Sequence, residues 1–464
     1  MKKVENTPRK AFRHHRARVF QVLVFFIVFY ICAVISWLIP LRPSYSAAEN
    51  RELTRFPSFS FSALAGGEWF DDIGTWFSDT FPCRDALLSL NGAVKSLYGV
   101  SSVQISSNVQ EGDEIPDAPA EPATMPETTA PATEPATQPV TSAAGQTDDD
   151  RQRPPGLDHE PAQDLGATLL IGDSAFEYYN FVQSKADEYA ATVNRACSQL
   201  AGSAAVYDII VPTSMDICVP DSVRKGLKTS DQKKAIEYMY GSMSGQVKTV
   251  PLFDTLRSHH ENGEYIYFRT DHHWTALGAY YAYTGFCETK GTPAAALSTF
   301  EEHVYSDYLG SFYRETGKPK ALGNHPDIVV AYEPPHGNTM TITDSKGKSF
   351  ESPIVSDVTT WNRYYKYSTF IGGDNPLSVI RNDAAATRDT CVLVKESFGN
   401  AFAPFLSETY RTVYIIDYRY FHKVDSRSLQ QFVREEGVDD VIFLNNISVT
   451  RSADLLERLS YLVR

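Results

Sequence analysis

The sequence predicts an α/β sandwich built on a mainly parallel sheet, preceded by one N-terminal transmembrane helix. Short apolar runs rich in β-branched residues alternate with helical stretches from residue 167 to the end. Buried runs of about four to eight such residues are typical of strands in parallel sheets, and strand–helix alternation is typical of α/β sandwiches. An uncharged apolar run near the N-terminus predicts the membrane helix.

Residues 19–39, VFQVLVFFIVFYICAVISWLI, have the length of about 20 residues that a membrane-spanning helix needs. The basic tail of residues 1–18 contains one acid, Glu5, so the positive-inside rule places it in the cytoplasm and everything after the helix outside. We therefore expect a single-pass plasma-membrane protein that meets the lipid bilayer through one helix. The alternative is a cleaved signal peptide, for which Ser46-Ala47-Ala48 offers small residues, although such peptides have apolar regions of about 7–15 residues.

The rest of the chain divides by composition. Residues 40–106 form a membrane-proximal extracytoplasmic segment with a helical, amphipathic pattern. Residues 107–165 are rich in Pro, Thr, Ala and acids, a composition that predicts a disordered linker because it offers too little apolar surface to bury. Residues 166–464 form the α/β domain, in which the less regular stretch 300–385 is expected to be an inserted lobe.

Within the α/β domain, the expected elements follow from the apolar runs and the periodic segments between them. Active groups in such sheets gather where the strands end. The predicted strands are 167–172, 205–213, 249–253, 391–396, 412–417 and 440–445. The predicted helices are 184–200, 230–241, 275–289, 399–408, 427–436 and 452–462.

Charge and cysteine content narrow the functional classes. The net charge is -14, which argues against a nucleic-acid partner because phosphate binding needs clustered Lys and Arg. The cysteines are scattered without a CxxC pair, so most are expected to be small buried hydrophobic residues. A disulfide between Cys197 and Cys218 is the alternative for a domain outside the cell.

The segment 265–283, YIYFRTDHHWTALGAYYAY, carries the first chemical signal. A strand-like run ends at Arg269, and Asp271, His272 and His273 follow in a short loop before a helix. A carboxylate two residues from an imidazole can fix its tautomer and stabilise the imidazolium that forms when it takes a proton. Asp271 and His273 are therefore an expected orienting acid and base.

The segment 391–405, CVLVKESFGNAFAPF, carries the second signal. Ser397 follows a buried strand and precedes a helix, so its hydroxyl is expected at the edge of the sheet. Its own N–H and the start of the helix point toward the place where an oxyanion would develop. This arrangement resembles a nucleophile turn, although the sequence is not GxSxG. The two segments together supply an acid, a base and a nucleophile.

These motifs resemble the DHHW protein family: RTDHHW, the upstream ENR and FSDxFPxRD segments, VPTS at 211–214 and KESFGNAF downstream. The family is similar to alginate O-acetylation proteins and to SGNH hydrolase-like acyltransferases. The resemblance implies an SGNH-like three-layer α/β/α sandwich with Asp271, His273 and Ser397 as a catalytic triad. Glu396 departs from the pattern, which usually has Asp there.

A second serine competes for the role of nucleophile. IGDSAF at 171–176 places Ser174 in a GDS element like the first block of ordinary SGNH hydrolases. Asp271 and His273 then follow in the usual order. In the related acetylation proteins the serine comes after the Asp-His pair, which favours Ser397 over Ser174. Geometry has to decide between them.

Four further residues are candidates for supporting roles. Arg269 is expected to pair with an acid and hold the loop, and His272 to be structural or to face substrate. Asn400 and the backbone N–H of Gly372 are candidate oxyanion donors. A metal is not expected, because adjacent side chains on one loop rarely converge on one ion, and no cofactor is expected.

The implied function is a membrane-anchored extracytoplasmic O-acyl (acetyl) transferase acting on a cell-envelope polysaccharide. Because acyl donors are scarce outside the cytoplasm, the resemblance implies a multi-spanning membrane O-acyltransferase as partner. One rival is a carbohydrate esterase (deacetylase) that uses the same residues. The other is a non-catalytic envelope-binding scaffold protein that has kept the fold.

Overall fold

The computed structural model describes residues 168–464 together with 45–46, 51–52, 56, 73, 76, 80, 112–116 and 162–164. The chain divides into two compact units, Met1–Ser102 and Val103–Arg464. In the first unit, β1 (Tyr45–Ser46) and β2 (Arg51–Glu52) pair antiparallel. The predicted span 19–39 and most of the predicted linker lie outside the described residues. None of the described helices is long and apolar enough to cross a bilayer.

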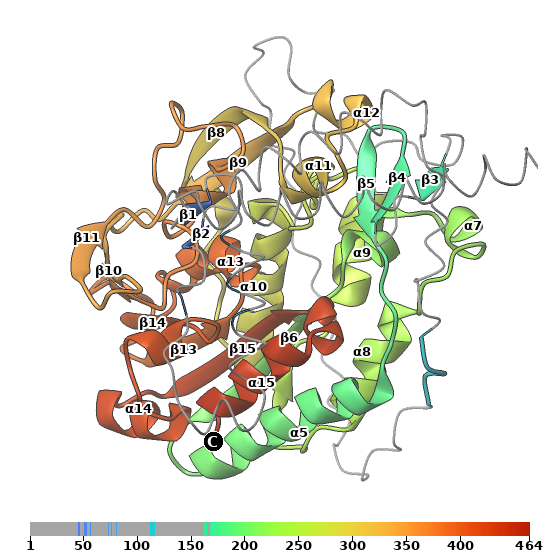
Figure 1. Ribbon diagram of the computed structural model, residues 1–464. Helices are drawn as coiled ribbons and strands as arrows, with labels where there is room; N and C mark the ends of the chain where they lie inside the picture. Colours follow the sequence, from blue (N-terminus) through green and yellow to red (C-terminus); the bar gives the residue numbers. More distant parts are fainter. Residues whose placement is uncertain are drawn as a thin grey trace, which may run out of the picture. The chain divides into compact units, whose positions relative to one another are not determined.

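An eight-stranded sheet forms the centre of the second unit, in the order β11-β10-β12-β14-β13-β15-β6-β7 (Figure 1). Strands β14, β13, β15, β6 and β7 are parallel, and β12, β10 and β11 extend the sheet antiparallel. Its strands are β6 (Ala205–Val211), β7 (Lys248–Thr249), β10 (Met340–Thr343), β11 (Ser349–Ser352), β12 (Leu377–Arg381), β13 (Thr390–Lys395), β14 (Thr412–Asp417) and β15 (Asp440–Asn446).

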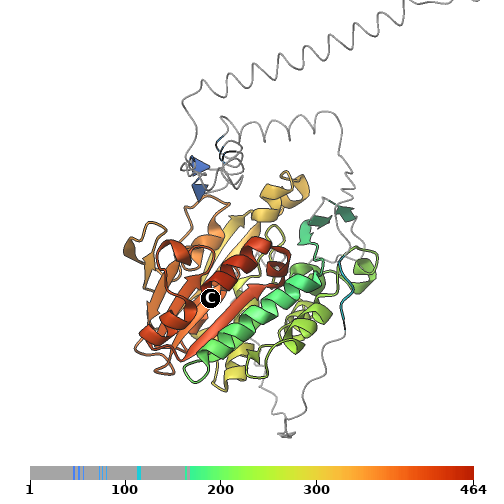
Figure 2. The same ribbon diagram turned by 60° about the horizontal axis from the view of Figure 1, so that its bottom comes forward.

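Helices cover both faces of this sheet because its central strands are apolar on both sides. In β13, Val392 and Val394 belong to one buried cluster, while Cys391 and Leu393 belong to the other, as the two-residue period of a strand requires. The first cluster contains residues of α5 (Gln183–Leu200), α8 (Gln232–Gly241), α14 (Leu429–Glu436) and α15 (Ala453–Leu462). Figure 2 shows α5 in green and α15 in red in front of the sheet. The second contains residues of α9 (Phe253–Glu261), α10 (Ala276–Lys290) and α13 (Gly399–Leu406).

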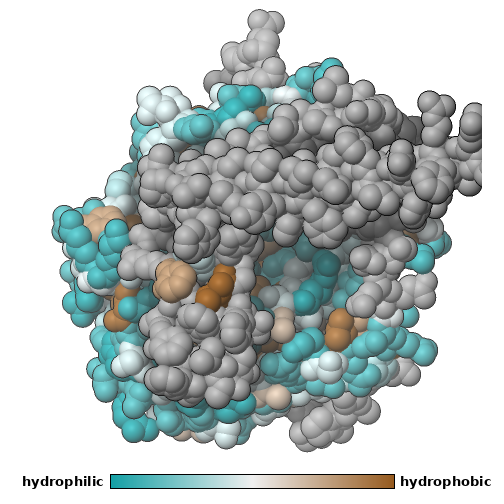
Figure 3. All heavy atoms as spheres, viewed as in Figure 1, coloured by the Kyte–Doolittle hydropathy of each residue, from teal (hydrophilic) through white to brown (hydrophobic). Residues whose placement is uncertain are grey.

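The remaining elements are short. They are the helices α6 (Ser214–Cys218), α7 (Asp221–Arg224), α11 (Ser311–Glu315) and α12 (Lys320–Gly323), and the 3-10 turns η3 (Leu297–Thr299), η4 (Lys366–Thr369), η5 (Phe421–Lys423) and η6 (Ile447–Arg451). Strands β8 (Glu301–Tyr308) and β9 (Asp327–Glu333) pair antiparallel outside the main sheet. Hydrophilic side chains predominate among the described residues on the face that Figure 3 shows.

The structure corrects the predicted place of the first strand. The run 167–172 does not join the parallel sheet: β4 (Thr168–Ile171) pairs antiparallel with β3 (Ala162–Asp164) and with β5 (Ser174–Glu177). The physical reason is the Gly172-Asp173 pair between β4 and β5. Gly172 has φ +56°, which suits the tight hairpin turns that favour glycine. An apolar run on either side of such a turn makes a hairpin.

Three smaller expectations also change. Part of the expected lobe 300–385 builds onto the main sheet as β10, β11 and β12. Only Thr249 of the predicted strand 249–253 lies in a strand, β7, because Pro251 lacks a ladder donor and Phe253 begins α9. Cys197 and Cys218 are free thiols, so the alternative of a disulfide between them is wrong. Burial raises the pKa of Cys197, as expected of an inert buried thiol.

Candidate active site

Asp271 and His273 lie on the loop between the bridge at Tyr267 and the start of α10. The pairing of Tyr267 with Trp274 closes this loop, and the Thr275 side chain caps α10 by accepting from the Gly278 amide. The segment ending at Arg269, expected to be a strand, thus contributes one isolated bridge. The bridge and the helix cap therefore fix where the loop begins and ends.

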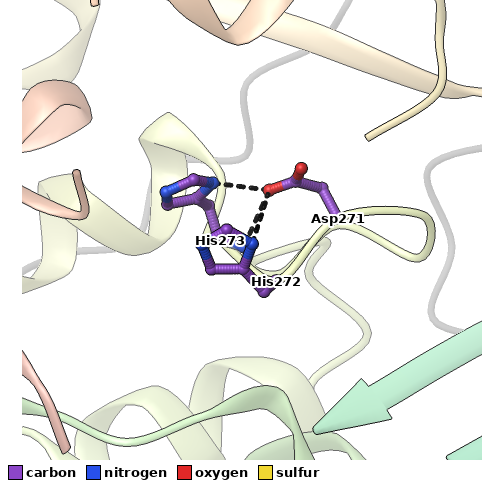
Figure 4. Close-up of side chains that lie close together, drawn as sticks. All are labelled: Asp271, His272 and His273. Atoms are coloured by element: carbon purple, nitrogen blue, oxygen red, sulfur yellow. Dashed lines mark hydrogen bonds and ion pairs between the residues drawn. The ribbon is translucent and has the colours of Figure 1, made fainter. Parts of the chain in front are cut away.

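A carboxylate holds the imidazole of His273 in place. Oδ1 of Asp271 lies 2.5 Å from Nδ1 of His273 and also accepts from the His273 backbone amide at 2.9 Å (Figure 4). Oδ2 of Asp271 accepts from the amide of Ser311 at 2.7 Å. Burial by itself would raise the pKa of Asp271, but His273, His272 and these hydrogen bonds lower it well below its ordinary value. The carboxylate is therefore ionised and orients the ring.

The other ring nitrogen of His273 faces Ser397. Nε2 of His273 lies 2.7 Å from Oγ of Ser397, across 124 residues of sequence. Ser397 follows β13 directly and precedes α13, so the strand end and the helix start fix its position. Asp271, His273 and Ser397 thus form one continuous chain of hydrogen bonds, the geometry needed for a base to remove a proton from a hydroxyl.

Ser174 is not part of this chain. Its side chain is buried in β5, and its Oγ donates to Oδ1 of Asp173 at 3.1 Å. The amide of Ala175 donates to the carbonyl of Arg269, so the hairpin supports the histidine loop from the side. In the GDS element, Gly172 and Asp173 form the hairpin turn and Ser174 begins β5.

Glu396 holds the nucleophile turn together. Its Oε2 accepts from the hydroxyl of Ser397 at 3.1 Å and from the amide of Phe398 at 3.2 Å. Its Oε1 accepts from the amide of Asn446 at the end of β15. The single proton of the Ser397 hydroxyl is therefore shared between two acceptors, His273 and Glu396.

Arg269 anchors the start of the histidine loop. Its guanidinium lies 3.0 Å from Asp173 and 3.5 Å from the fully buried Asp327 of β9. Asp327 also accepts from the amide and the hydroxyl of Thr270. Burial raises the pKa of Asp327, although Arg269 and Thr270 oppose the shift. Arg269 acts on the loop and does not extend into the cleft at Ser397.

His272 lies beside the hydrogen-bonded chain of Asp271, His273 and Ser397, which is called the relay from here on. Its Nδ1 lies 2.6 Å from Oγ of Ser311, the residue whose amide also binds Asp271. Burial and the neighbouring His273 lower the pKa of His272, so the ring is neutral near pH 7. Asp271, His272 and His273 bring potential ligand atoms within 4.8 Å of one another. Since Asp271 and His273 are bonded to each other and His272 to Ser311, these atoms already have partners.

The candidate oxyanion donors were Asn400 and the backbone N–H of Gly372, and the structure gives Asn400 another partner. Nδ2 of Asn400 donates to Asp374 at 2.9 Å, while its buried Oδ1 has no partner among the described residues. Gly372 lies in the expected turn with φ +64°, and its carbonyl accepts from Asn375. Asn400 thus fixes the start of α13 to the turn that contains Gly372. The side-chain amide of Asn400 therefore donates to Asp374 and not to a group at Ser397.

Three residues that sequence reasoning did not single out complete the site. The ring of Tyr367 stacks on His273, and its hydroxyl donates to the carbonyl of Ser397 at 3.1 Å. Ser311 and Tyr308 both bind Asp271. All three lie in the irregular stretch 300–385, where no motif or periodicity marks them.

Ser397 opens onto a cleft of about 330 Å³. Its walls come from β5, α11, the loop after β14, and the segment 446–455; they include Glu177, His272, Phe312, Glu315, Glu396, Arg419, Ser448 and Leu455. A larger cavity of about 650 Å³, lined by Cys218, Arg257 and His260 among others, contains none of the relay residues. The smaller cleft is the one at which the relay can act.

The fold and the relay define an α/β protein with a Ser–His–Asp arrangement at the end of its sheet. A profile of the DHHW protein family matches residues 49–127 and 158–416, so the chain belongs to the DHHW protein family. A search of curated proteins finds no match.

Two of the similar solved structures, with TM-scores above 0.5, agree with this fold. A DHHW family protein from Eubacterium siraeum is 27% identical with a TM-score of 0.57; the match covers 64% of this chain and 96% of that one. Bacillus cereus PatB1, solved with a sulfonyl adduct, is 17% identical with a TM-score of 0.53 and coverage of 63% and 99%. A more distant match, at 12% identity and TM-score 0.33, is the O-acetyltransferase domain of Pseudomonas putida AlgJ, with coverage of 62% and 96%.

Proposed function

We propose that this chain is an extracytoplasmic O-acyl (acetyl) transferase that acts on a cell-envelope polysaccharide and is anchored in the plasma membrane by residues 19–39. The observation that carries the proposal is the unbroken chain of hydrogen bonds from Asp271 through His273 to Ser397. Ser397 lines a cleft, through which an ester can reach its hydroxyl. A multi-spanning membrane O-acyltransferase would supply the acyl group.

The chemistry follows from the relay. Ser397 Oγ attacks the carbonyl carbon of an ester while Nε2 of His273 takes its proton. Asp271 stabilises the imidazolium, which then protonates the departing alcohol and leaves an acyl-serine. A sugar hydroxyl next gives its proton to His273 and attacks the acyl carbon, so that a new ester forms and Ser397 is restored.

The position of Ser397 at a strand–helix junction supports charge stabilisation in this reaction. The serine lies where β13 ends and α13 begins, so the positive end of the helix faces the reacting carbonyl. Removal of one oxyanion donor costs about a hundredfold or more in other acyl-transfer enzymes, which shows how much such a position contributes.

The test is hydrolysis of p-nitrophenyl acetate by the full-length chain in detergent, beside Ser397→Ala and Ser174→Ala. We expect Ser397→Ala to abolish acetyl release and Ser174→Ala to retain it. Treatment with a sulfonyl fluoride should add one sulfonyl group on Ser397, as a mass spectrum of the digested protein would show. Loss of activity in Ser174→Ala alone would contradict the assignment of the nucleophile.

Transfer and hydrolysis differ in what attacks the acyl-serine. Adding an oligosaccharide acceptor to the same assay should yield an acetylated glycan, detected by mass spectrometry. Release of free acetate alone, with acceptor present in excess, would favour the esterase. A folded chain without Ser397-dependent turnover would favour the scaffold protein.

A further inference from the structure

The lining of the cleft at Ser397 is acidic. Glu177, Glu315 and Glu396 come from three separate elements, β5, α11 and the end of β13, and all face the cleft. Arg419 is the one lysine or arginine among the described residues of this lining. A substrate therefore meets carboxylates on several sides of the reacting serine.

The positive charge of Arg419 is already used within the protein. It binds Asp417 through Nε at 2.8 Å and through a terminal nitrogen at 2.6 Å, and it lies 2.9 Å from Asp374. The fully buried Lys395 also binds Asp417, at 2.8 Å. Two aspartates thus balance Lys395 and Arg419, and no net positive charge remains for an anionic ligand.

Of the three carboxylates in the lining, Glu177 has a balancing ion pair, whereas Glu315 and Glu396 have none among the described residues. Glu177 is bonded to Arg451 at 3.1 Å and to Ser448. Glu396 accepts hydrogen bonds from two amides and a hydroxyl. Glu315 faces the cleft from α11 and forms no ion pair among the described residues. Neutral donors satisfy the oxygens of Glu396, but they do not cancel its charge.

We propose that the acceptor is a glycan without acidic groups and that the cleft excludes a polyuronate. This inference rests on the proposed function and names the substrate class of the same site. A uronate carboxylate placed next to Glu315 and Glu396 would meet like charges in a partly desolvated space. Like-charge contacts of this kind weaken the binding of a wrong partner. They therefore contribute to the specificity of a site more than to its affinity for the right partner.

The test measures binding in the full-length Ser397→Ala variant in detergent, by titration calorimetry. The probes are tetrasaccharides of N-acetylglucosamine, of glucosamine and of galacturonate. We expect the neutral and the cationic probes to bind, and the uronate to bind at least about tenfold more weakly at low salt. Added salt should narrow that gap, because screening weakens the repulsion.

Variants that neutralise one carboxylate show which side chain weakens the binding of the uronate. Glu315→Gln should raise the affinity for the uronate severalfold and change the affinity for the neutral probe by a smaller factor. The matched control is Glu351→Gln, an exposed carboxylate on β11 outside the cleft, which should change neither. Uronate binding as tight as that of the neutral probe would overturn the inference, as would the absence of binding by all three.

The failure of the inference and the failure of the proposed function have different readouts. Ser397-dependent acetyl release by the wild-type chain reports on the function alone. Acetyl release together with tight uronate binding would overturn only the substrate class. No Ser397-dependent release would overturn the function and the inference with it.

Discussion

Tyr367 lies flat against His273, with ring centroids 4.0 Å apart and an angle of 12° between the rings. Its hydroxyl also donates to the carbonyl of Ser397, so one side chain contacts both partners of the proposed proton transfer. It comes from η4, far from either motif in sequence. The stacked ring restricts the imidazole to the plane in which Nε2 points at Ser397.

Replacing Tyr367 should separate stacking from hydrogen bonding. Tyr367→Phe keeps the ring and loses one hydrogen bond, so kcat should fall by less than about tenfold. Tyr367→Leu removes the flat surface and should lower kcat by about a hundredfold, because the base is no longer held in line. Acetyl release from p-nitrophenyl acetate measures both. Equal rates for Phe and Leu would show that the ring does not position His273.

Replacing Asp271 with Asn should leave the fold intact and lower kcat by about four orders of magnitude. The amide cannot stabilise the imidazolium and favours the wrong tautomer of His273. Asp254→Asn, an exposed acid on α9, is the control and should retain full activity. Circular dichroism checks that the variant is folded. A kcat of Asp271→Asn equal to that of the wild type would rule out the relay.

Gly310 should be essential for the position of Asp271. A Cβ at Gly310 would lie 2.2 Å from Oδ2 and from Cβ of Asp271, although φ of -85° suits any residue. Gly310→Ala must therefore push the carboxylate away, and we expect at least about a hundredfold loss of kcat and about 1–3 kcal/mol lower stability. Gly245→Ala, with open space around its Cβ, is the matched control. Normal activity in Gly310→Ala would contradict the tight fit.

Glu396→Gln should destabilise the nucleophile turn. The carboxylate accepts from three donors through two oxygens, whereas Gln has one acceptor oxygen and would turn its amide toward a donor. The expected loss is about 1–3 kcal/mol of unfolding free energy, measured by urea denaturation. Glu396→Asp keeps the negative charge on a shorter side chain, so it should lose less unfolding free energy than Glu396→Gln. A Gln variant as stable as the wild type would show that these bonds contribute little.

Stability should fall as pH rises from about 4 to 7, in part because of Asp208. Burial raises the pKa of this fully buried carboxyl to about 7, against a hydrogen bond from Tyr189 that lowers it. Between the unfolded and folded pKa values the folded state holds a proton that the unfolded state has lost, so rising pH favours unfolding. Three units correspond to at most about 4 kcal/mol.

The variant Asp208→Asn isolates that contribution. It keeps an acceptor for Tyr189 and cannot ionise, so its stability should depend less on pH between 4 and 7 and should exceed that of the wild type above pH 7. Thermal unfolding of both proteins at pH 5 and pH 8 is the measurement. Parallel pH profiles would mean that Asp208 does not titrate in this range. Asp216, whose pKa burial raises to about 6, stays the same in both proteins and cancels in the difference.

The sequence by itself predicted the central strands and the helices beside them. Apolar runs such as 205–213 and 440–445 are long enough and sufficiently β-branched to be read locally, and β6 and β15 occupy them. It also placed Asp271 and His273 on one loop and Ser397 between a strand and a helix, because two-residue spacing and strand–helix junctions are local features. It could not place β4, since an apolar run does not show which strand it pairs with.

Only the tertiary structure decided which serine meets the base and what holds the relay in place. His273 and Ser397 are 124 residues apart, and the bond from Ser311 to Asp271 spans 40. Contacts of such separation depend on sheet order and on how the chain between them packs, neither of which has a local periodicity. The order β14-β13-β15 brings the end of β13 beside Asn446, and the stretch 300–385 returns to the site with Ser311 and Tyr367.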